Sequence, residues 1–233
     1  MQKKISIIGS GFSSLSAACY LAKAGHQVEV FEKNEILGGR ARQFKAEGFT
    51  FDMGPSWYWM PDVFERFFND FGKKVSDYYQ LDKLNPGYSV FFGKNDKIDI
   101  EDSLDKIAKV FEAEEENSSS KLKNFMDEAS DNYDIAIKDL VYKPGVSPLE
   151  LVTWKTAKKV YQFFGNISND VDKDFKNERL RQILKFPVLF LGAKPSDTPS
   201  FYNFMNHADF GLGTWHPKGG MHQVVVAMVK LAK

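Results

Sequence analysis

The chain has 233 residues, of which 43% are hydrophobic and 15% aromatic, enough apolar material for the core of one large or two small domains. It carries 31 basic and 31 acidic residues in interspersed order, and this zero net charge argues against a nucleic-acid partner. Its one cysteine, Cys19, excludes an internal disulfide and a thiolate metal site, so we expect a small core residue there.

The first forty residues predict a strand, a glycine turn, a helix and a second strand. An apolar run over 5–8 indicates a buried strand, and an apolar face over 15–22, closed by Gly25, indicates a helix. Residues 28–31 indicate the second strand. A βαβ unit with a glycine turn after its first strand is typical of dinucleotide-binding domains.

The glycine turn has the composition that a pyrophosphate requires. Gly9 permits the tight turn out of the strand, and Gly11 lets the backbone approach a phosphate. The free N–H groups at the helix start, at Phe12, Ser13 and Ser14, would face the phosphate at the positive end of the helix dipole. Ser14 replaces the third glycine of the usual G-x-G-x-x-G pattern, which lowers the specificity of the motif although serine is still small.

An acidic residue closes the second strand. Glu32 follows Gly11 by 21 residues, at a position where a carboxylate can accept both ribose hydroxyls of an adenosine. Its negative charge would repel a 2′-phosphate, so we expect an unphosphorylated ribose. The adjacent Lys33 is included in the predicted nucleotide site. Glycine turns occur in many α/β proteins, and it is the order of strand, turn, helix, strand and acid that indicates dinucleotide binding.

The pattern then becomes more apolar. Residues 61–71 carry a phenylalanine stripe at helical spacing, ended by Gly72, which faces either the core or a substrate. Residues 88–92 and 98–100 predict a hairpin with its turn at 93–96.

The middle of the chain is predicted to be mostly helical. Asp102 is expected to cap a helix over 104–111. The polar, acidic stretch 112–120 is interpreted as a linker, and a helix is expected over 121–140.

A capping box with proline at the first helical position predicts a further helix start at 147–150. The segment from there to Phe164 carries aromatic residues and lysines on different faces. Two interpretations stay open: a surface helix that rests on lipid, or a helix that packs between domains with its lysines in solvent.

Neither a catalytic group nor a metal site is evident. His216 and His222 lie six residues apart across a glycine turn with no third ligand, so we expect structural or surface roles for both. No run approaches the roughly 18 to 20 apolar residues of a membrane span, and no signal peptide is present. We therefore expect a cytoplasmic protein, bound at most peripherally to the inner face of the cell membrane.

Two groups of motifs carry a resemblance to a known family. Residues 38–41 (GGRA) and 48–56 (GFTFDMGPS) resemble the flavin-dependent amine oxidase and carotenoid desaturase clan. The later motifs are similar to those of bacterial-type phytoene (carotenoid) desaturases, in order over essentially the whole chain: RQIL at 181–184, FPVLFLG at 186–192, TPSFY at 198–202 and GTWHPKGGM at 213–221.

The resemblance implies an α/β fold in which a Rossmann-like FAD-binding βαβ unit is combined with a discontinuous α+β substrate domain. The implied domains are 1–85 for the first part of the FAD-binding domain and 86–210 for a helical, membrane-associated substrate domain with a β-hairpin. Residues 211–233 would return toward the FAD domain.

The resemblance also implies FAD rather than NAD as the cofactor. Gly39 and Arg40 would lie near its pyrophosphate, and Gly54 and Ser56 near the flavin ring. The implied activity is desaturation of a long apolar carotenoid precursor by hydride transfer to flavin, at a membrane surface. The oligomeric state is left open.

Other functions remain compatible with the same motifs. A carotenoid isomerase, a saturase or a desaturase of a shorter polyene cannot be separated from a phytoene desaturase. A non-catalytic lipid-binding escort on the same fold is the other alternative, although it would gain nothing from Glu32 and the glycine pair. Because the family continues well past Lys233, we expect an N-terminal fragment that is inactive by itself.

Overall fold

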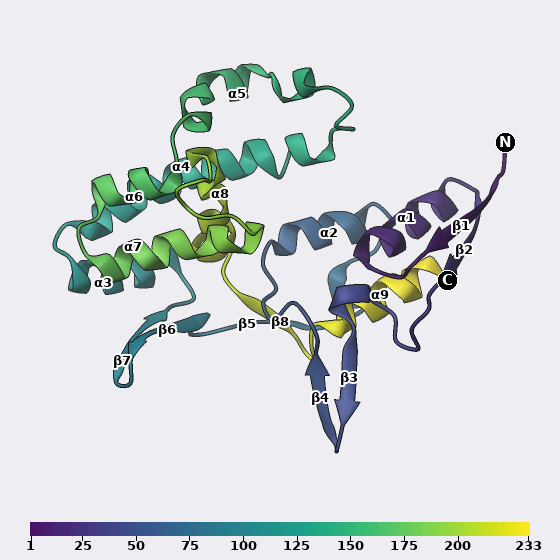
Figure 1. Ribbon diagram of the computed structural model, residues 1–233. Coiled ribbons are helices and arrows are strands. Elements are labelled where there is room, and N and C mark those ends of the chain that lie inside the picture. Colours follow the sequence, from purple (N-terminus) through teal and green to yellow (C-terminus); the bar gives the residue numbers. More distant parts are fainter. The chain divides into compact units, whose positions relative to one another are not determined.

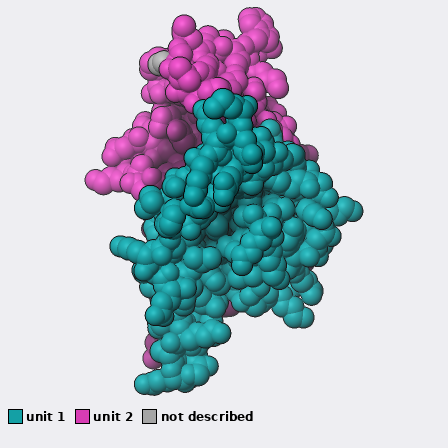
Figure 2. Space-filling model, turned by 90° about the vertical axis from the view of Figure 1, so that its right-hand side faces the viewer, with its two compact units in different colours: residues 1–83, 215–233 teal, residues 84–214 magenta. Residues whose placement is uncertain are grey.

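The computed structural model describes the backbone of residues 1–233 and every side chain except that of Pro148 (Figure 1). The chain forms two compact units, residues 1–83 with 215–233 and residues 84–214 (Figure 2). The division falls at 83/84 and 214/215, against expected boundaries at 85/86 and 210/211. The assignment of these units to a cofactor and to a substrate stays a prediction.

The first unit is built on the predicted βαβ motif. Strands β1 (Lys4–Ile8) and β2 (Gln27–Phe31) pair in parallel, and α1 (Phe12–Lys23) connects them. Gly25, with φ of 86°, ends the connection in a conformation that side-chain-bearing residues rarely adopt. Helix α9 (His222–Ala232), near the other end of the sequence, packs against α1.

A hydrophobic core joins distant parts of this unit. Helix α2 (Pro61–Asn69) buries Phe68 fully, while Phe64 and Phe67 pack against the same core. The predicted phenylalanine stripe therefore faces the core of the first unit. The other large members come from α1, from the segment before α2, from the short helix η2 (Val75–Asp77) and the residues after it, and from α9 with its N-cap residue. They are Leu15, Tyr58, Val75, Tyr79, Met221, Val225 and Met228.

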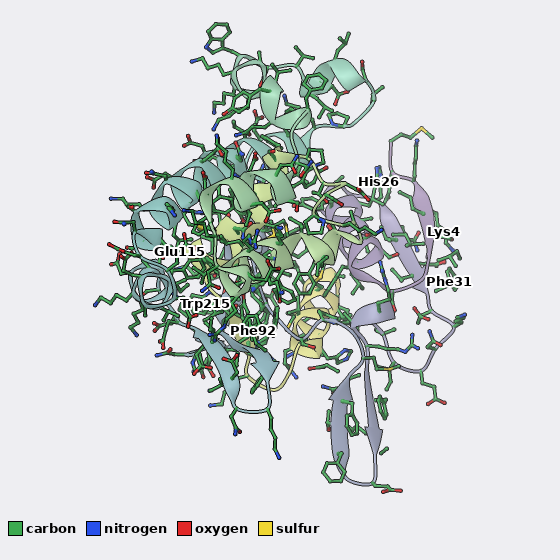
Figure 3. All side chains as sticks on the ribbon, turned by 60° about the vertical axis from the view of Figure 1, so that its left-hand side comes forward. Lys4, His26, Phe31, Phe92, Glu115 and Trp215 are labelled. Atoms are coloured by element: carbon green, nitrogen blue, oxygen red, sulfur yellow. The ribbon has the colours of Figure 1, made fainter. Side chains whose placement is uncertain are left out.

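Two strand pairs of the first unit were not predicted. Strands β3 (Gln43–Ala46) and β4 (Phe49–Asp52) form an antiparallel hairpin. Strands β5 (Leu81–Lys83) and β8 (Trp215–Pro217) pair where the chain leaves and re-enters this unit. The labelled Trp215 lies on this re-entering strand (Figure 3).

The second unit combines the predicted hairpin with a helical core. Strands β6 (Tyr88–Gly93) and β7 (Asp96–Ile100) form the hairpin. Helix α3 (Leu104–Glu114) packs on α4 (Ser118–Ala136), and α6 (Ile167–Asp174) packs on α7 (Glu178–Lys185).

Shorter helical turns complete this unit. They are η3 (Leu140–Tyr142), η4 (Pro148–Leu151), α5 (Trp154–Lys158), η5 (Val160–Phe163), η6 (Phe186–Leu191), η7 (Ser200–Asn203), α8 (Phe204–Asn206) and a π-helical turn (His207–Gly211). No helix in the described part of the chain is long and apolar enough to cross a membrane.

The predicted linker at 112–120 is wrong. Helix α3 continues to Glu114 and α4 begins at Ser118, so only three residues connect them. The Glu112 carboxylate accepts from the N–H groups of Asn117 and Ser119 and closes this turn. Glu115, labelled in Figure 3, accepts from two N–H groups at 176 and 177. These bonds fix the connection within the second unit.

The predicted cap at Asp102 is also wrong. Ser103 is the N-cap residue of α3, and its side chain makes no capping hydrogen bond. Asp102 instead forms an ion pair of 2.7 Å with Lys106, one helical turn further along. Asp102 does precede the helix, but its carboxylate pairs with Lys106 four residues later and does not cap the helix.

The segment 147–164 starts as predicted but does not form one helix. Ser147 and Glu150 make the predicted capping box. The helix ends at Leu151 because Val152 and Thr153 are extended, and Thr153 then begins α5 with a second capping box. The continuous amphipathic helix assumed in both interpretations is therefore replaced by three short turns.

Candidate functional site

The candidate site is the turn between β1 and α1. Gly9 follows the end of β1 with φ of 95°, a left-handed conformation that glycine adopts without strain. Its N–H donates to the carbonyl oxygen of Phe31 at 2.7 Å, which ties the turn to the end of β2. A backbone hydrogen bond therefore ties the turn to the end of the second strand.

The start of α1 offers hydrogen-bond donors to an anion. Leu15 N–H makes the first intrahelical bond, to the carbonyl oxygen of Gly11 at 3.0 Å, so the N–H groups at 12–14 lack helical partners. Gly11 is the N-cap, and no side chain of the described residues caps the helix. A Cβ placed on Gly11 would meet no atom within 4 Å. The turn thus has open space at Gly11, next to N–H groups without helical partners, an arrangement that suits phosphate recognition.

Glu32 is held in place by the same turn. Its Oε2 accepts from the N–H of Ser10 at 2.9 Å and from the Ser10 hydroxyl at 2.6 Å. Its Oε1 accepts from the N–H and the side-chain amide of Asn34, at 2.9 and 2.8 Å. The Ser10 hydroxyl, followed by the Asn34 N–H, lowers the pKa of Glu32 from 4.5 to about 2, so the carboxylate is charged at neutral pH.

The glycine pair at 38–39 joins this network. The N–H of Gly38 donates to the carbonyl oxygen and to the hydroxyl of Ser10, both at 3.1 Å. A Cβ on Gly39 would lie 3.3 Å from the Cα of Gly11, so the two glycine turns approach each other closely. Arg40 is exposed and makes no ion pair with any described residue.

The motif at 48–56 contacts the backbone next to the glycine pair. A Cβ on Gly54 would overlap the carbonyl oxygen of Arg40, so the backbones at 40 and 54 are in contact. Asp52, two residues earlier, accepts from the N–H of Met221 at 2.8 Å and of His222 at 3.3 Å. It therefore caps α9 and joins the end of β4 to a helix 170 residues away.

His222 has a structural contact. Its Nδ1 lies 3.2 Å from the carbonyl oxygen of Ala41, which links α9 to the helical turn η1 (Gly39–Ala41). This agrees with the structural role expected for His222.

The structure thus brings together most, but not all, of the predicted site residues. Around one turn lie Gly9, Gly11, Phe12, Ser13, Ser14, Glu32 and Gly39, with Arg40 and Gly54 adjoining. Lys33 and Ser56 are exposed, and neither takes part in the hydrogen bonds that join the turn to Glu32 and the glycine pair. Sequence reasoning missed Ser10 and Asn34, which hold Glu32. The only hint in the sequence was that both residues are polar and lie next to the residues of the predicted site.

The fold and this turn have the arrangement of a Rossmann-like domain. Residues 7–71 match the family model of the NAD(P)-binding Rossmann-like domain. Among solved structures, wild-type putrescine oxidase bound to putrescine superimposes with a TM-score of 0.58 over 100% of this chain and 49% of its own, at 19% identity. Cyclohexylamine oxidase from Brevibacterium oxydans superimposes with a TM-score of 0.57 over 100% of this chain and 50% of its own, at 18% identity. At these identities the matches establish the fold, and they confirm the expected α/β class with a Rossmann-like unit.

In sequence, the chain is similar to carotenoid desaturases. A carotenoid 3,4-desaturase of Haloarcula japonica is 42% identical over 98% of this chain and 47% of its own length. A 4,4′-diapophytoene desaturase of Staphylococcus haemolyticus is 32% identical over 98% and 46%. A zeta-carotene-forming phytoene desaturase of Myxococcus xanthus is 30% identical over 99% and 45%. The resemblance seen in the motifs is confirmed, and the chain spans about half the length of these relatives.

Proposed function

We propose that this chain provides the FAD-binding part of an oxidoreductase that desaturates a long apolar polyene of the phytoene type. The observation that supports the proposal is the Ser10 network, in which Glu32, the glycine turn after β1 and the glycine pair are in mutual contact. The similarity to carotenoid desaturases over nearly the whole chain supports the choice of polyene.

The residues of the turn fit an adenosine diphosphate moiety. The open space at Gly11 and the unused N–H groups of α1 suit a pyrophosphate. The charged carboxylate of Glu32 suits a ribose with free hydroxyls and disfavours a 2′-phosphate. Arg40 is exposed beside the close approach of the two glycine turns, where its charge would face a phosphate.

Binding at Glu32 requires an exchange of hydrogen bonds. A carboxylate offers about four lone-pair directions, and Ser10 and Asn34 fill all four in this structure. Ribose hydroxyls must therefore replace side-chain donors, the Ser10 hydroxyl or the Asn34 amide, while the backbone N–H groups keep the carboxylate oriented.

FAD, when bound, supplies the capacity to accept a hydride from a carbon–hydrogen bond. The chain's own residues would bind and orient it: Glu32 at the ribose, the α1 N-terminus and Arg40 at the pyrophosphate, and the backbone at Gly54 and Ser56 near the ring. Because FAD would accept the hydride and the protein would only bind and orient it, the reaction requires no cluster of acidic and basic side chains.

We further propose that the second unit meets an anionic lipid surface, from which an apolar substrate is taken. Trp154 and Phe164 are 77% and 87% exposed, with further exposed apolar side chains at Val146, Leu149 and Val152. Lysines accompany them on the same segment, and the Lys158 ammonium lies 5.1 Å from the Trp154 ring centre. Exposed aromatic and basic side chains together are typical of proteins that bind at a membrane interface.

An apolar hollow of about 290 Å³ adjoins this segment. Val141, Leu151 and Phe163 line it and are also exposed at the surface. Such a hollow would accommodate part of a hydrocarbon chain that leaves the lipid. Its lining also includes Ala136, Ile137, Leu140, Phe201, Tyr202 and Phe204.

Nucleotide competition tests the cofactor assignment. The purified chain is titrated with FAD, ADP, NAD and NADP, and binding is followed by flavin fluorescence or calorimetry. We expect FAD to bind most tightly, ADP to compete with it, and NADP to fail because of Glu32. Preference for NADP, or binding of an apolar polyene without any binding of FAD, would contradict the proposal; the second result would favour a lipid-binding escort.

Vesicle flotation tests the lipid surface. We expect the chain to bind vesicles that contain anionic lipid, to lose much of this binding in W154A/F164A, and to bind less at high salt. The matched control is F91A, because Phe91 is exposed on the hairpin β6 of the same unit. Equal binding by W154A/F164A and the parent chain would contradict the assignment of this surface.

A further inference from the structure

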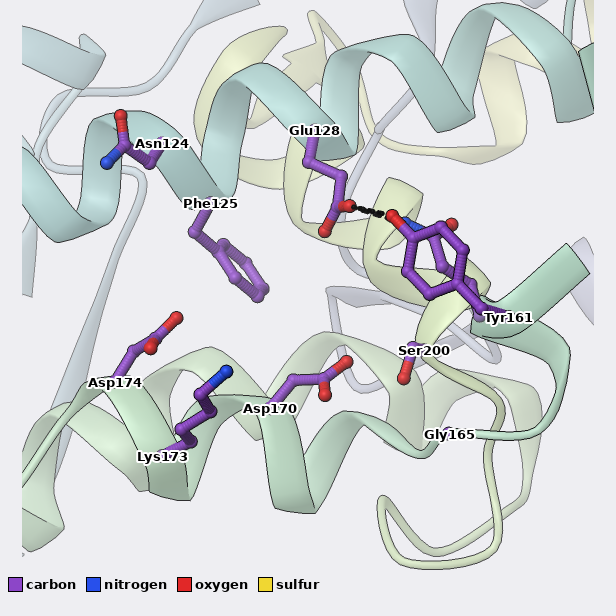
Figure 4. Close-up of a pocket in the computed structure, with 10 residues that line it drawn as sticks. Asn124, Phe125, Glu128, Tyr161, Gly165, Asp170, Lys173, Asp174 and Ser200 are labelled. Carbon is purple, nitrogen blue, oxygen red and sulfur yellow. Dashed lines mark hydrogen bonds between the residues drawn. The ribbon is translucent and has the colours of Figure 1, made fainter. Parts of the chain in front are cut away.

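The second unit contains an open hollow of about 380 Å³ between α4 and α6 (Figure 4). Phe125 and Glu128 line it from α4, and Asp170, Lys173 and Asp174 line it from α6. All of its lining residues belong to the second unit. Neither the nucleotide turn nor the apolar hollow explains this group of charges.

Glu128 is a fixed negative charge on the wall of the hollow. Its carboxylate accepts from the Tyr161 hydroxyl at 3.1 Å (Figure 4). It also accepts from the Gln162 amide at 2.5 Å and from the Asn203 amide at 3.3 Å. All three donors are neutral, and no described lysine or arginine forms an ion pair with it. The carboxylate is therefore oriented by the protein but not neutralised.

The opposite wall adds to the negative charge. Asp170 and Asp174 lie there with one lysine, Lys173, so the hollow carries three carboxylates and one ammonium group. Burial, followed by the charge of Glu128 and, more weakly, that of Asp170, raises the pKa of the Tyr161 hydroxyl. Charges from both walls thus act on the same region of the hollow.

A buried hydroxyl on the hollow has no hydrogen-bond partner. Ser200 is only 4% exposed and lines the hollow, and its Oγ makes no hydrogen bond with any described residue. A Cβ on Gly165 would lie 2.6 Å from this oxygen, so the hydroxyl fits only because residue 165 is a glycine. A buried hydroxyl without a partner costs free energy that a ligand could recover.

Together these features suit a small organic cation with N–H donors. No group of three His, Cys, Asp or Glu among the described residues could hold a metal ion, so the negative charge is too dispersed for one. An ammonium group can donate to Glu128 and to the Ser200 hydroxyl, and its methylene groups can pack on the Phe125 and Tyr161 rings. The volume is that of a small-molecule site. We propose that this hollow binds a small primary alkylammonium ion.

Calorimetric titration of the purified chain with n-butylammonium tests the site. We expect one saturable event that weakens with added salt, because the recognition is electrostatic. Neutral n-butanol has the same carbon chain without the charge and should not bind. Tetramethylammonium has the charge without N–H donors and should bind at least several-fold more weakly. Equal binding of n-butanol and n-butylammonium, or no saturable binding of n-butylammonium, would overturn the proposal.

Single substitutions give effects of opposite sign. Glu128→Gln should weaken binding about tenfold or more, because it removes a charged hydrogen-bond acceptor. Lys173→Gln should tighten binding, because it removes the one competing ammonium group. Asp127→Asn, on the same helix and outside the hollow, is the matched control and should change nothing.

Two further variants keep the test decisive if Glu128→Gln fails to fold. Asp170 is at the surface and Ser200→Ala removes only a hydroxyl without a partner, so both proteins should fold. Asp170→Asn and Ser200→Ala should each weaken binding several-fold. Unchanged affinity in both variants, or weaker binding in Lys173→Gln, would overturn the proposal.

Discussion

The hydroxyl of Ser10 donates to the carboxylate of Glu32 at 2.6 Å, while the same oxygen accepts from the N–H of Gly38 at 3.1 Å. One small side chain therefore connects the phosphate turn, the acid at the end of β2 and the glycine pair. In the proposed nucleotide site the acid is positioned in advance, which would reduce the entropy that binding must overcome.

Replacement of Ser10 by alanine should change the titration of Glu32. The Ser10 side chain is the largest cause of the lowered pKa, so S10A should raise the pKa of Glu32 from about 2 toward its ordinary value of 4.5. Because the folded pKa is the lower one, Glu32 adds stability above about pH 4.5 and loses it as the pH falls through about 2. Carboxyl ¹³C NMR measures the shift. S13A is the control, and an identical Glu32 titration in S10A and S13A would contradict this account.

Removal of the Glu32 carboxylate should weaken FAD binding. A hydrogen bond to a charged group contributes about 1.5–3 kcal/mol, so E32A should bind FAD roughly ten- to hundredfold more weakly. E29A is the matched control, because Glu29 lies on the same strand and forms an exposed ion pair with Lys4. Fluorescence titration gives both affinities. FAD affinity that is equal in E32A and E29A would show that the ribose does not bind at Glu32.

Gly54 is predicted to be required by packing. G54A places a methyl group onto the carbonyl oxygen of Arg40, and the resulting overpacking should cost about 1–3 kcal/mol of unfolding free energy. The control is G48A in the turn between β3 and β4, where φ is 82° but no atom lies within 4 Å of the new Cβ. That variant should cost only the backbone strain, about 1 kcal/mol. Denaturant unfolding compares both variants with the parent, and a G54A protein as stable as the parent would contradict the close contact at Arg40.

Buried Asp209 should make the second unit less stable as the pH rises. Burial raises its pKa from 3.8 to about 7, although the hydrogen bond of 2.5 Å from Tyr88 acts in the opposite direction. Between these values the folded chain holds a proton that the unfolded chain has released, so stability falls as the pH rises from about 4 to 7. This rise in pKa corresponds to about 4 kcal/mol.

The variant D209N isolates this effect, because the amide oxygen can still accept from Tyr88. Its unfolding free energy should depend less on pH between 4 and 7 than that of the parent, with D127N as the control. Chemical denaturation at several pH values measures the slopes. Parallel curves for D209N and the parent would show that Asp209 is ionised in the folded chain throughout this range.

The parts of the fold that local patterns specify were predicted from sequence. The βαβ unit, the hairpin β6–β7 and the capping box at Ser147 follow from residues within a few positions of one another. The pairing of β5 with β8 does not, because three-residue strands separated by more than 130 residues carry no periodic signal. The role of Asp52 as a cap of α9 is invisible for the same reason.

The candidate site shows the same limit. The proximity of the glycines and Glu32 was predicted because their spacing is typical of dinucleotide-binding turns, and their role in binding stays a prediction. Ser10 and Asn34 were missed because their role depends on how the turn folds back onto β2. The break at Val152 was missed because the capping box predicts a helix start and gives no information on its length.

The most direct test of the account is the identity and amount of the nucleotide that the purified chain holds. The protein is saturated with a mixture of FAD, NAD and NADP, freed of unbound nucleotide and denatured, and the released compounds are identified by absorbance and mass. We predict FAD at close to one molecule per chain in the parent and in E29A, and much less in E32A. Release of NAD or NADP in place of FAD, or FAD retained equally by E32A, would contradict the proposed function.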